Sequence, residues 1–393
     1  MRIVAVNEAA VPVRSEMRNA VFSFRDLTTS VVAVVTDVVR DGRPVIGYAF
    51  NSTGRYACGA QMRARFIPRL LGARPEALLD DRGANFDPAK ALAIMLAGEK
   101  PGGHSERSIA IGTIEVALWD AVAKIEGLPL YRSLANRYSG GVTRERMFVY
   151  VGGGWYRPGG TLGDLQAEIG GHLDAGYRMV KIKVGGLPLA EDVKRVEAAL
   201  AVVGSPDRLA VDANARFGRG ETLAYAAALA PYRLRWFEEP CDPHDYALMA
   251  ELAAAYAPPL ATGENLYSTQ DVVNLARFGG WRAGRDVIQV DPPQAYGIVQ
   301  YARTLEALAP LGFRRTSFWP HGGNQMSLHV AAGFGLGGCE SYPGVFGVFG
   351  AFGGFADDAR IEDGMLALPE RPGIGFEAQA ALVEVLRGAA PAH

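Results

Sequence analysis

The 393-residue chain is poor in cysteine, and its three cysteines, Cys58, Cys241 and Cys339, include no Cys-x-x-Cys pair. Three such thiols cannot build a disulfide framework. An excess of one charge is also missing, because 40 lysines and arginines balance 42 aspartates and glutamates, for a net charge of −2. A near-neutral chain lacks the electrostatic footprint that nucleic acid or a membrane surface requires, so neither partner is expected.

Long apolar runs are absent as well. No stretch reaches the roughly 18 consecutive apolar residues that a membrane span needs. Residues 1–13 alternate like a strand and include Glu8, unlike the apolar segment of a signal peptide, so we expect a cytoplasmic protein. Hydrophobic residues nevertheless make up 49% of the chain and charged residues 21%, which predicts a sizeable core and excludes global disorder.

The N-terminal part predicts a small α+β unit. Alternating runs at 30–39 and 43–50 flank Asp41-Gly42, a strong β-hairpin signal. Residues 57–71 and 86–98 show helical periodicity, and residues 108–125 carry apolar side chains at i, i+3 and i+4. These patterns indicate three helices after a sheet.

The pattern changes after Arg144, where short apolar runs alternate with helical stretches. The runs cover residues 147–151, 179–184, 209–212, 234–239, 260–264, 287–291 and 316–321, with a weaker eighth at 337–341. Strands alternating with helices predict parallel strands joined by crossovers, and eight units over about 200 residues fit a β/α barrel best. Asp363-Gly364 then predicts another hairpin, followed by a final helix that returns to the N-terminal unit.

Ionisable side chains stand where six consecutive runs end. They are Lys181 with Lys183, then Asp212, Glu238, Glu264, Asp291 and His321. Successive ends from Lys183 onward lie 26 to 30 residues apart, which is one strand-loop-helix unit. In a barrel these positions meet at the carboxyl ends of the strands, where such folds keep their active sites.

Asp212, Glu238 and Glu264 come from three neighbouring strands and predict a metal site. Carboxylates forced together need a shared proton or a cation, and oxygen ligands favour Mg²⁺ first and Mn²⁺ second. A separate salt bridge is the alternative for any one of them. Period two places Glu239 on the opposite face from Glu238, where we expect it to brace a lysine. Asn214 points the same way as Asp212, and either contacts substrate or caps a turn.

Lys181 and Lys183 share one face of their strand. Two lysines in one cavity depress each other's pKa, which makes one of them a candidate base near neutral pH. Lysines that face solvent are the alternative, although the flanking apolar residues argue against it. His321 precedes two glycines that open backbone access, and Asp291 on the neighbouring strand is placed to hold one of its ring nitrogens.

These motifs resemble those of the enolase superfamily, in its mandelate racemase-like branch. The matching pieces are VKIKVGG, VDAN, FEEP, TGEN, VIQVD and WPHGG. Within that branch the chain is most similar to the D-tartrate dehydratases, through stretches such as MRNAVFSF, EKPGGHSERS and HGGNQMSL. The resemblance implies an α/β fold, a modified TIM barrel (β/α)₇β over residues 141–359. It also implies an α+β capping domain, residues 1–140, completed by residues 360–393.

The resemblance also implies an activity, that of a Mg²⁺-dependent acid-sugar dehydratase. Such an enzyme removes the proton α to a carboxylate and eliminates the β-hydroxyl, giving a 2-oxo acid. The implied metal ligands are Asp212, Glu238 and Glu264. The implied catalytic residues are Lys183 as the base, Lys181 as its electrostatic partner, His321 as the acid and Asp291 as its orienter. The implied substrate contacts are Asn19, Lys100 and Glu340, joined by Asn214.

We therefore expect a small sugar acid or hydroxy diacid as the substrate, and a homo-oligomer. A racemase, epimerase or cycloisomerase of the same branch would use the same lysine and histidine without losing water. A metal-free aldolase that forms a Schiff base on one lysine belongs to another enzyme class. A non-catalytic binding protein is the third alternative, and it leaves the acidic triad without a chemical role.

Overall fold

The first fifty residues form a three-stranded antiparallel sheet. The computed structural model describes residues 1–52, 55–343 and 349–389. In the sheet order β1-β2-β3, the strands are β1 (Ile3–Pro12), β2 (Thr28–Arg40) and β3 (Arg43–Phe50). β2 and β3 turn at Asp41-Gly42, so the predicted hairpin is confirmed.

Five helices follow this sheet. They are α1 (Gly59–Gln61), α2 (Ile67–Leu71), α3 (Pro88–Leu96), α4 (Glu106–Glu126) and α5 (Leu130–Tyr138). A π-helical turn, Met62–Phe66, connects α1 to α2, so the periodic stretches 57–71, 86–98 and 108–125 are helical as predicted. No helix in the described part of the chain is both long and apolar enough to cross a bilayer.

Helix α4 is buried along nearly its whole length and approaches both neighbours at backbone distance. A Cβ on Gly47 of β3 would lie 2.0 Å from the carbonyl oxygen of Ala117 in α4. A Cβ on Gly112 of α4 would lie 2.1 Å from the carbonyl oxygen of Pro293, in the loop after β9. Only glycine permits approaches this close, so α4 is held tightly between the small sheet and the larger one.

Glu115 fixes α4 to a helix of the larger sheet. Its carboxylate accepts the backbone N–H groups of Ile298 and Val299 at 2.8 and 2.9 Å. These residues begin α11 (Ile298–Leu308), whose first N–H groups have no partner within the helix. One buried side chain therefore caps a helix from a different part of the chain.

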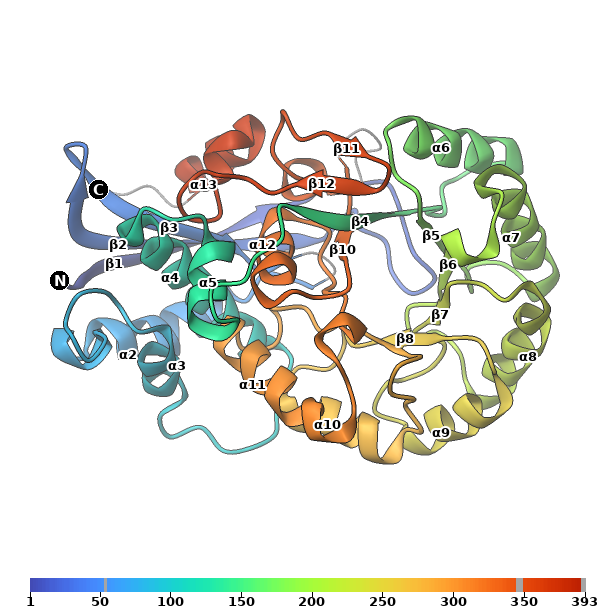
Figure 1. The fold of residues 1–393 in the computed structure, drawn as a ribbon, viewed down its shortest axis with the longest axis horizontal. Helices are drawn as coiled ribbons and strands as arrows, with labels where there is room; N and C mark the ends of the chain where they lie inside the picture. Colours follow the sequence, from blue (N-terminus) through green and yellow to red (C-terminus); the bar gives the residue numbers. More distant parts are fainter. Residues whose placement is uncertain (53–54, 344–348, 390–393) are drawn as a thin grey trace.

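The larger sheet is mainly parallel. Its strands in order are β4 (Arg146–Gly153), β5 (Val180–Lys183), β6 (Leu209–Asp212), β7 (Trp236–Glu238), β8 (Leu260–Thr262) and β9 (Val287–Ile288). The connecting helices are α6 (Leu162–Asp174), α7 (Leu189–Val203), α8 (Arg219–Leu229), α9 (Tyr246–Ala255), α10 (Thr269–Phe278) and, after β9, α11. These helices follow one another around the outside of the strands (Figure 1).

β9 and β10 (Cys339–Ser341) are the last parallel strands, and β10 pairs with β4. The predicted run 316–321 differs from a regular strand, because Arg315–Ser317 form a 3₁₀ turn and only Phe318 makes a bridge, to Ile288. Pro320 has no N–H with which to extend the pairing. After this segment, α12 (Gln325–Phe334) leads into β10.

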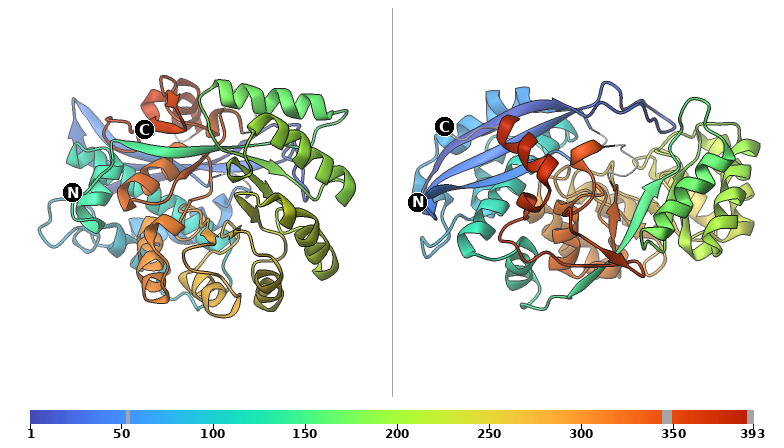
Figure 2. Two further views of the ribbon diagram at one scale, coloured as in Figure 1. Left: turned by 45° about the vertical axis from the view of Figure 1, so that its right-hand side comes forward. Right: turned by 90° about the horizontal axis from the view of Figure 1, so that it is seen from above.

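The C-terminal segment divides between the two sheets (Figure 2). The Asp363-Gly364 turn joins β11 (Ile361–Glu362) to β12 (Met365–Ala367), as predicted, and β12 pairs antiparallel with β4. α13 (Ala380–Ala389) instead contacts β1 and β2. That residues 360–393 complete the capping domain stays a prediction: within this segment β12 lies beside β4, whereas α13 lies beside β1 and β2.

The inner face of the larger sheet changes character along the strands. An apolar cluster of its own is formed by Tyr150, Met179, Ala210, Trp236, Ala261, Val287 and Trp319. Two residues further along, Met179 is followed by Lys181, and Trp236 by Glu238. Period two keeps these side chains on one face, so the ionisable groups lie next to this apolar cluster. Its aromatic members, Tyr150, Trp236 and Trp319, are called the aromatic floor below.

His329 of α12 generates a testable dependence of stability on pH. Its Nδ1 accepts the N–H of Tyr131 in α5 at 3.1 Å, and its Nε2 lies 3.0 Å from the carbonyl oxygen of Ile374. Burial lowers the pKa of His329 to about 4. The pKa of a histidine in the unfolded chain is about 6.5. The stability that the folded protein gains from keeping His329 neutral is therefore fully present above pH 6.5. It is lost as the pH falls toward 4, because only the unfolded chain takes up the proton.

We expect the free energy of unfolding to fall by about 1.4 kcal/mol per pH unit from this group as the pH drops below 6.5. His329→Gln should flatten that component, because a glutamine does not titrate. The measurement is urea unfolding of both proteins at pH 7 and pH 5. Equal pH dependence in the two proteins would contradict the assignment.

Candidate active site

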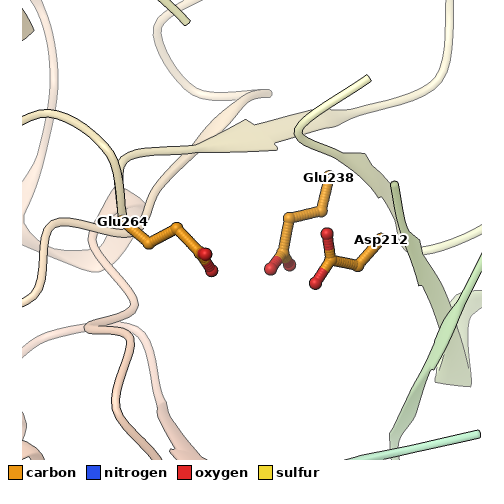
Figure 3. A group of neighbouring side chains, drawn as sticks. All are labelled: Asp212, Glu238 and Glu264. Atoms are coloured by element: carbon orange, nitrogen blue, oxygen red, sulfur yellow. The ribbon is translucent and has the colours of Figure 1, made fainter. Parts of the chain in front are cut away.

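Three carboxylates meet at the carboxyl ends of neighbouring strands. Asp212 ends β6, Glu238 ends β7 and Glu264 follows β8. One oxygen from each lies within 4.8 Å of the others, and Figure 3 shows the three side chains pointing toward one another. A donor set made only of carboxylate oxygens fits a hard divalent cation.

The charge balance within this triad also fits a cation. Burial, Asp212 and Glu340 raise the pKa of Glu238 to about 7, although Lys181 opposes them. Glu238 Oε2 accepts hydrogen bonds from Trp236 Nε1 at 2.8 Å and Gln289 Nε2 at 2.7 Å, which fix its orientation. A bound divalent cation would relieve the repulsion that remains among the carboxylates.

Lys181 lies inside the acidic cluster. Its ammonium contacts Glu238, lies 2.6 Å from Glu340 and is 3.7 Å from Asp212. Burial opposes its charge, but Glu238 and Glu340 raise the pKa of Lys181 well above its usual value. The expectation that the two lysines depress each other's pKa is therefore wrong for Lys181, because carboxylates from β7 and β10 outweigh the second ammonium.

Lys183 lies closer to open space. Its Nζ is 2.5 Å from Asp212 Oδ2 and 4.4 Å from the ring centre of Trp155. Burial would raise the pKa of Asp212, but Lys183 and Lys181 hold it below its usual value. Lys183 lines a small cavity at the strand ends, whereas Lys181 does not.

His321 is held by the aspartate that the sequence indicated. Its Nδ1 lies 2.8 Å from Asp291 Oδ2, which also accepts a hydrogen bond from Ser52 Oγ at 2.6 Å. Its Nε2 faces Glu264 Oε2 at 3.3 Å. Burial disfavours the imidazolium, yet Glu264 and Asp291 raise the pKa of His321 to about 9. Ser52 had no signal in the sequence, because it comes from the loop after β3.

Lys183, which ends β5, and His321, which follows the Phe318 bridge to β9, both line the cavity. In the strand order, β6, β7, β8 and β9 lie between β5 and the segment that carries His321. The polar side chains that line the cavity are Asn19, Arg55, Lys183, Asn214, Glu264 and His321. Aromatic side chains, Trp155 and Tyr342 among them, complete the described part of its wall.

The expected substrate contacts are only partly brought together. Asn19 and Asn214 line the cavity, and Asn214 Nδ2 donates to Asp212 Oδ2 at 3.2 Å. Glu340 lies beneath it, paired with Lys181. Lys100 is exposed on the loop between α3 and α4 and is not among the residues that line the cavity.

Arg55 also lines the cavity, although no signal in the sequence placed it there. Its Nε donates to the hydroxyl of Tyr267 at 2.7 Å. The sequence offered only an arginine in a loop after an apolar strand, and nothing local shows that this loop reaches the strand ends of the other sheet. Its position depends on long-range packing.

Glu239 differs from the expectation that it braces a lysine. Its carboxylate accepts the side-chain amide of Asn265 at 2.8 and 2.7 Å. Its backbone φ is +41°, outside the extended region. The strand therefore ends in a kink at Glu239, and the period-two argument that aimed it at a lysine no longer applies.

Comparison with known proteins identifies the family. The family described as enolase C-terminal domain-like matches residues 164–382, more than half of the chain. The chain therefore belongs to the enolase superfamily. This agrees with the resemblance that the strand-end motifs carried.

Similar proteins include sugar-acid enzymes. The chain is 28% identical over 356 residues to L-talarate/galactarate dehydratase of Salmonella typhimurium, covering 88% of this chain and 81% of that protein. It is 28% identical over 291 residues to 3,6-anhydro-alpha-L-galactonate cycloisomerase of Streptomyces coelicolor, covering 70% of each. A crystal structure of the Salmonella dehydratase, liganded with Mg and L-lyxarohydroxamate, superposes with a TM-score of 0.76 at 25% identity. That match covers 98% of this chain and 92% of that one.

The acidic triad and the Mg-bound relative together identify Mg²⁺ as the cofactor. We expect Mg²⁺ to bind the purified protein and raise its unfolding temperature, because a ligand that binds only the folded state stabilises it. Glu264→Gln should lose both effects, since it removes one ligand charge. Calorimetric titration and thermal unfolding measure them.

Glu239→Gln is the matched control, because Glu239 is a glutamate next to Glu238 in the chain whose carboxylate is bound by Asn265. It should retain Mg²⁺ binding. Loss of binding in Glu239→Gln with retention in Glu264→Gln would overturn the ligand assignment.

Proposed function

We propose that this protein is a Mg²⁺-dependent dehydratase that acts on a small hydroxy diacid, with D-tartrate as the first candidate. The observation that carries the proposal is that Lys183 and His321 line one cavity together with Glu264 of the acidic triad. The dehydratase relative supports the reaction class. The motifs at 17–24 and 99–108, which resemble those of the tartrate dehydratases, support the choice of substrate.

The same observations support a closed barrel with a capping domain. At one end of the row of parallel strands β10 pairs with β4, and at the other end Phe318 forms a bridge to β9. The N–H of Gly337, just before β10, donates to the carbonyl oxygen of Phe318 at 3.0 Å. These contacts support a ring in which the first and last strands meet. We therefore propose a (β/α)₇β barrel for residues 141–359, with residues 1–140 as the cap over its mouth.

The proposed reaction begins with Lys183. The proton α to a carboxylate is weakly acidic, and Mg²⁺ held by the triad would stabilise the negative charge that develops on the carboxylate oxygens. Lys183 then takes the α-proton on Nζ. Lys181 keeps its own proton, because its carboxylate partners favour the charged form, and it adds positive charge next to the reacting centre.

His321 completes the elimination. The electron pair of the broken C–H bond first moves onto the carboxylate oxygens, giving an enediolate. It then forms a C=C bond between the α- and β-carbons as the bond from the β-carbon to its hydroxyl breaks. His321 Nε2 donates a proton to the departing oxygen, and water is released. The resulting enol tautomerises to a 2-oxo acid. Asp291 holds Nδ1 and so aims Nε2 into the cavity.

A second candidate function is epimerisation or cycloisomerisation. Two proton-transfer groups in one cavity, Lys183 and His321, could remove a proton on one face of the substrate and return it on the other, and one relative is a cycloisomerase. Product analysis separates the two, because only dehydration yields a 2-oxo acid. A Schiff-base role for Lys181 is disfavoured by its raised pKa, since that chemistry needs a neutral amine.

The division of labour between base and acid can be tested with the α-proton. In deuterated solvent, His321→Asn should retain exchange of that proton while losing dehydration, provided that Lys183 exchanges its proton before the hydroxyl leaves. Lys183→Ala should lose both. Lys194→Ala, which removes an exposed lysine of α7, is the control. Nuclear magnetic resonance monitors the exchange. If the α-proton still exchanges in Lys183→Ala, the assignment of Lys183 as the base is wrong.

The choice of substrate can be tested through Arg55. A diacid places a second carboxylate away from the metal, and Arg55 is the arginine that lines the described cavity. A charge-assisted hydrogen bond of about 1.5–3 kcal/mol predicts that Arg55→Met lowers kcat/KM for D-tartrate by about 10- to 100-fold. A monoacid of similar length should change much less.

Lys100→Met is the matched control, since Lys100 is the competing cation. A selective loss on the diacid in Lys100→Met, with none in Arg55→Met, would transfer the role to Lys100. The wild-type protein should be assayed with D-tartrate beside aldonic and other aldaric acids. A kcat/KM below about 10² M⁻¹s⁻¹ for D-tartrate, with a better monoacid, would rule out the diacid proposal.

A further inference from the structure

A second pocket lies at the opposite end of the strands from the active site. Its lining includes Arg235, which precedes β7, together with Asp286, which precedes β9, and Ser317, which precedes the Phe318 bridge. Its volume is about 480 Å³. Trp319 of the aromatic floor forms part of its wall, so this floor separates the two sites.

Three arginines line this pocket: Arg235, Arg285 and Arg314. In the part of the chain that the structure describes, none of the three forms an ion pair with a carboxylate. The acid in the pocket wall, Asp286, is already bound by Arg282 through two contacts of 2.7 and 2.8 Å. The pocket therefore carries an excess of positive charge.

Arg235 is the most constrained of the three. Its guanidinium carbon lies 5.3 Å from the ring centre of Trp319 and 5.9 Å from that of Trp236, within the range of a cation–π contact with each ring. Burial lowers its pKa, and the charge of Asp207 offsets only part of this effect. A half-buried guanidinium that lacks a carboxylate partner is costly, and an anion placed against it would remove that cost.

Arg285 and Arg314 are the two exposed arginines of the pocket wall. Arg285 is exposed, and its Nη1 donates to the carbonyl oxygen of Ala257 at 3.2 Å, which leaves further N–H groups on its guanidinium. Arg314 is exposed as well. Planar guanidiniums bind oxyanions through pairs of N–H groups. Two hydroxyl-bearing residues, Thr316 and Ser317, belong to the same wall.

We propose that this pocket binds a small multivalent oxyanion, a phosphate-bearing or polycarboxylate molecule. The pocket lies apart from the acidic triad, so the proposal does not depend on the function proposed above. It assigns to this chain a second ligand site at the amino ends of β7, β8 and β9.

The test uses the full chain with Mg²⁺ and three probes: inorganic phosphate, trimetaphosphate and tricarballylate. Calorimetric titration should detect binding that weakens with added NaCl, because salt screens exposed charges. Arg314→Met and Arg235→Met should each weaken binding at least about tenfold. Arg43→Met, in the distant β2–β3 hairpin, should leave it unchanged. Tighter binding of the phosphates or of tricarballylate identifies the natural ligand class.

Glu264→Gln separates this site from the active site, since it should retain the oxyanion while losing Mg²⁺. Arg314 is exposed, so Arg314→Met keeps the test valid if Arg235→Met fails to fold. Equal affinities in the wild type, Arg314→Met and Arg43→Met would overturn the proposal. Absence of binding by all three probes at low salt would do the same.

Discussion

The site depends on holding buried carboxylates next to one another without unfolding the strands that carry them. Asp212, Glu238 and Glu340 are fully buried, and two lysines from β5 lie among them. Neither set of charges would tolerate burial alone, because an unpaired buried charge is expensive. The acidic and basic strand ends therefore stabilise each other, and the remaining carboxylate excess creates the demand for a metal ion.

The aromatic floor beneath these charges serves the same arrangement. Trp236 packs in the apolar cluster and also donates from its indole to Glu238, so one side chain both fills the interior and orients a metal ligand. Water is kept from the lower side of the site by Tyr150, Trp236 and Trp319. Electrostatic interactions above such a floor act in a low dielectric and are correspondingly strong.

Much of this arrangement could be predicted from the sequence, because strand periodicity and the spacing of strand ends are local. The run predicted at residues 209–212 has the same bounds as strand β6, and Asp212 is its last residue, as expected. What could not be predicted depends on other parts of the chain. The pKa of Lys181 is set by carboxylates of β7 and β10, and Arg55 enters the cavity from the other sheet. The contact of Glu239 could not be predicted, because its positive φ ends the alternation of side chains along the strand.

The close packing of α4 against both of its neighbours limits how far the small sheet can move relative to the larger one. Gly47 and Gly112 leave no space on either side of this helix, and Glu115 ties it to α11. The small sheet therefore cannot swing as a hinged lid without breaking backbone contacts that only glycine permits. Any opening of the cavity therefore falls to short segments of its wall, such as residues 18–24, which carry Asn19, Phe22 and Phe24. Because these segments are distinct from the strand ends, the cavity can change shape without displacing the acidic triad.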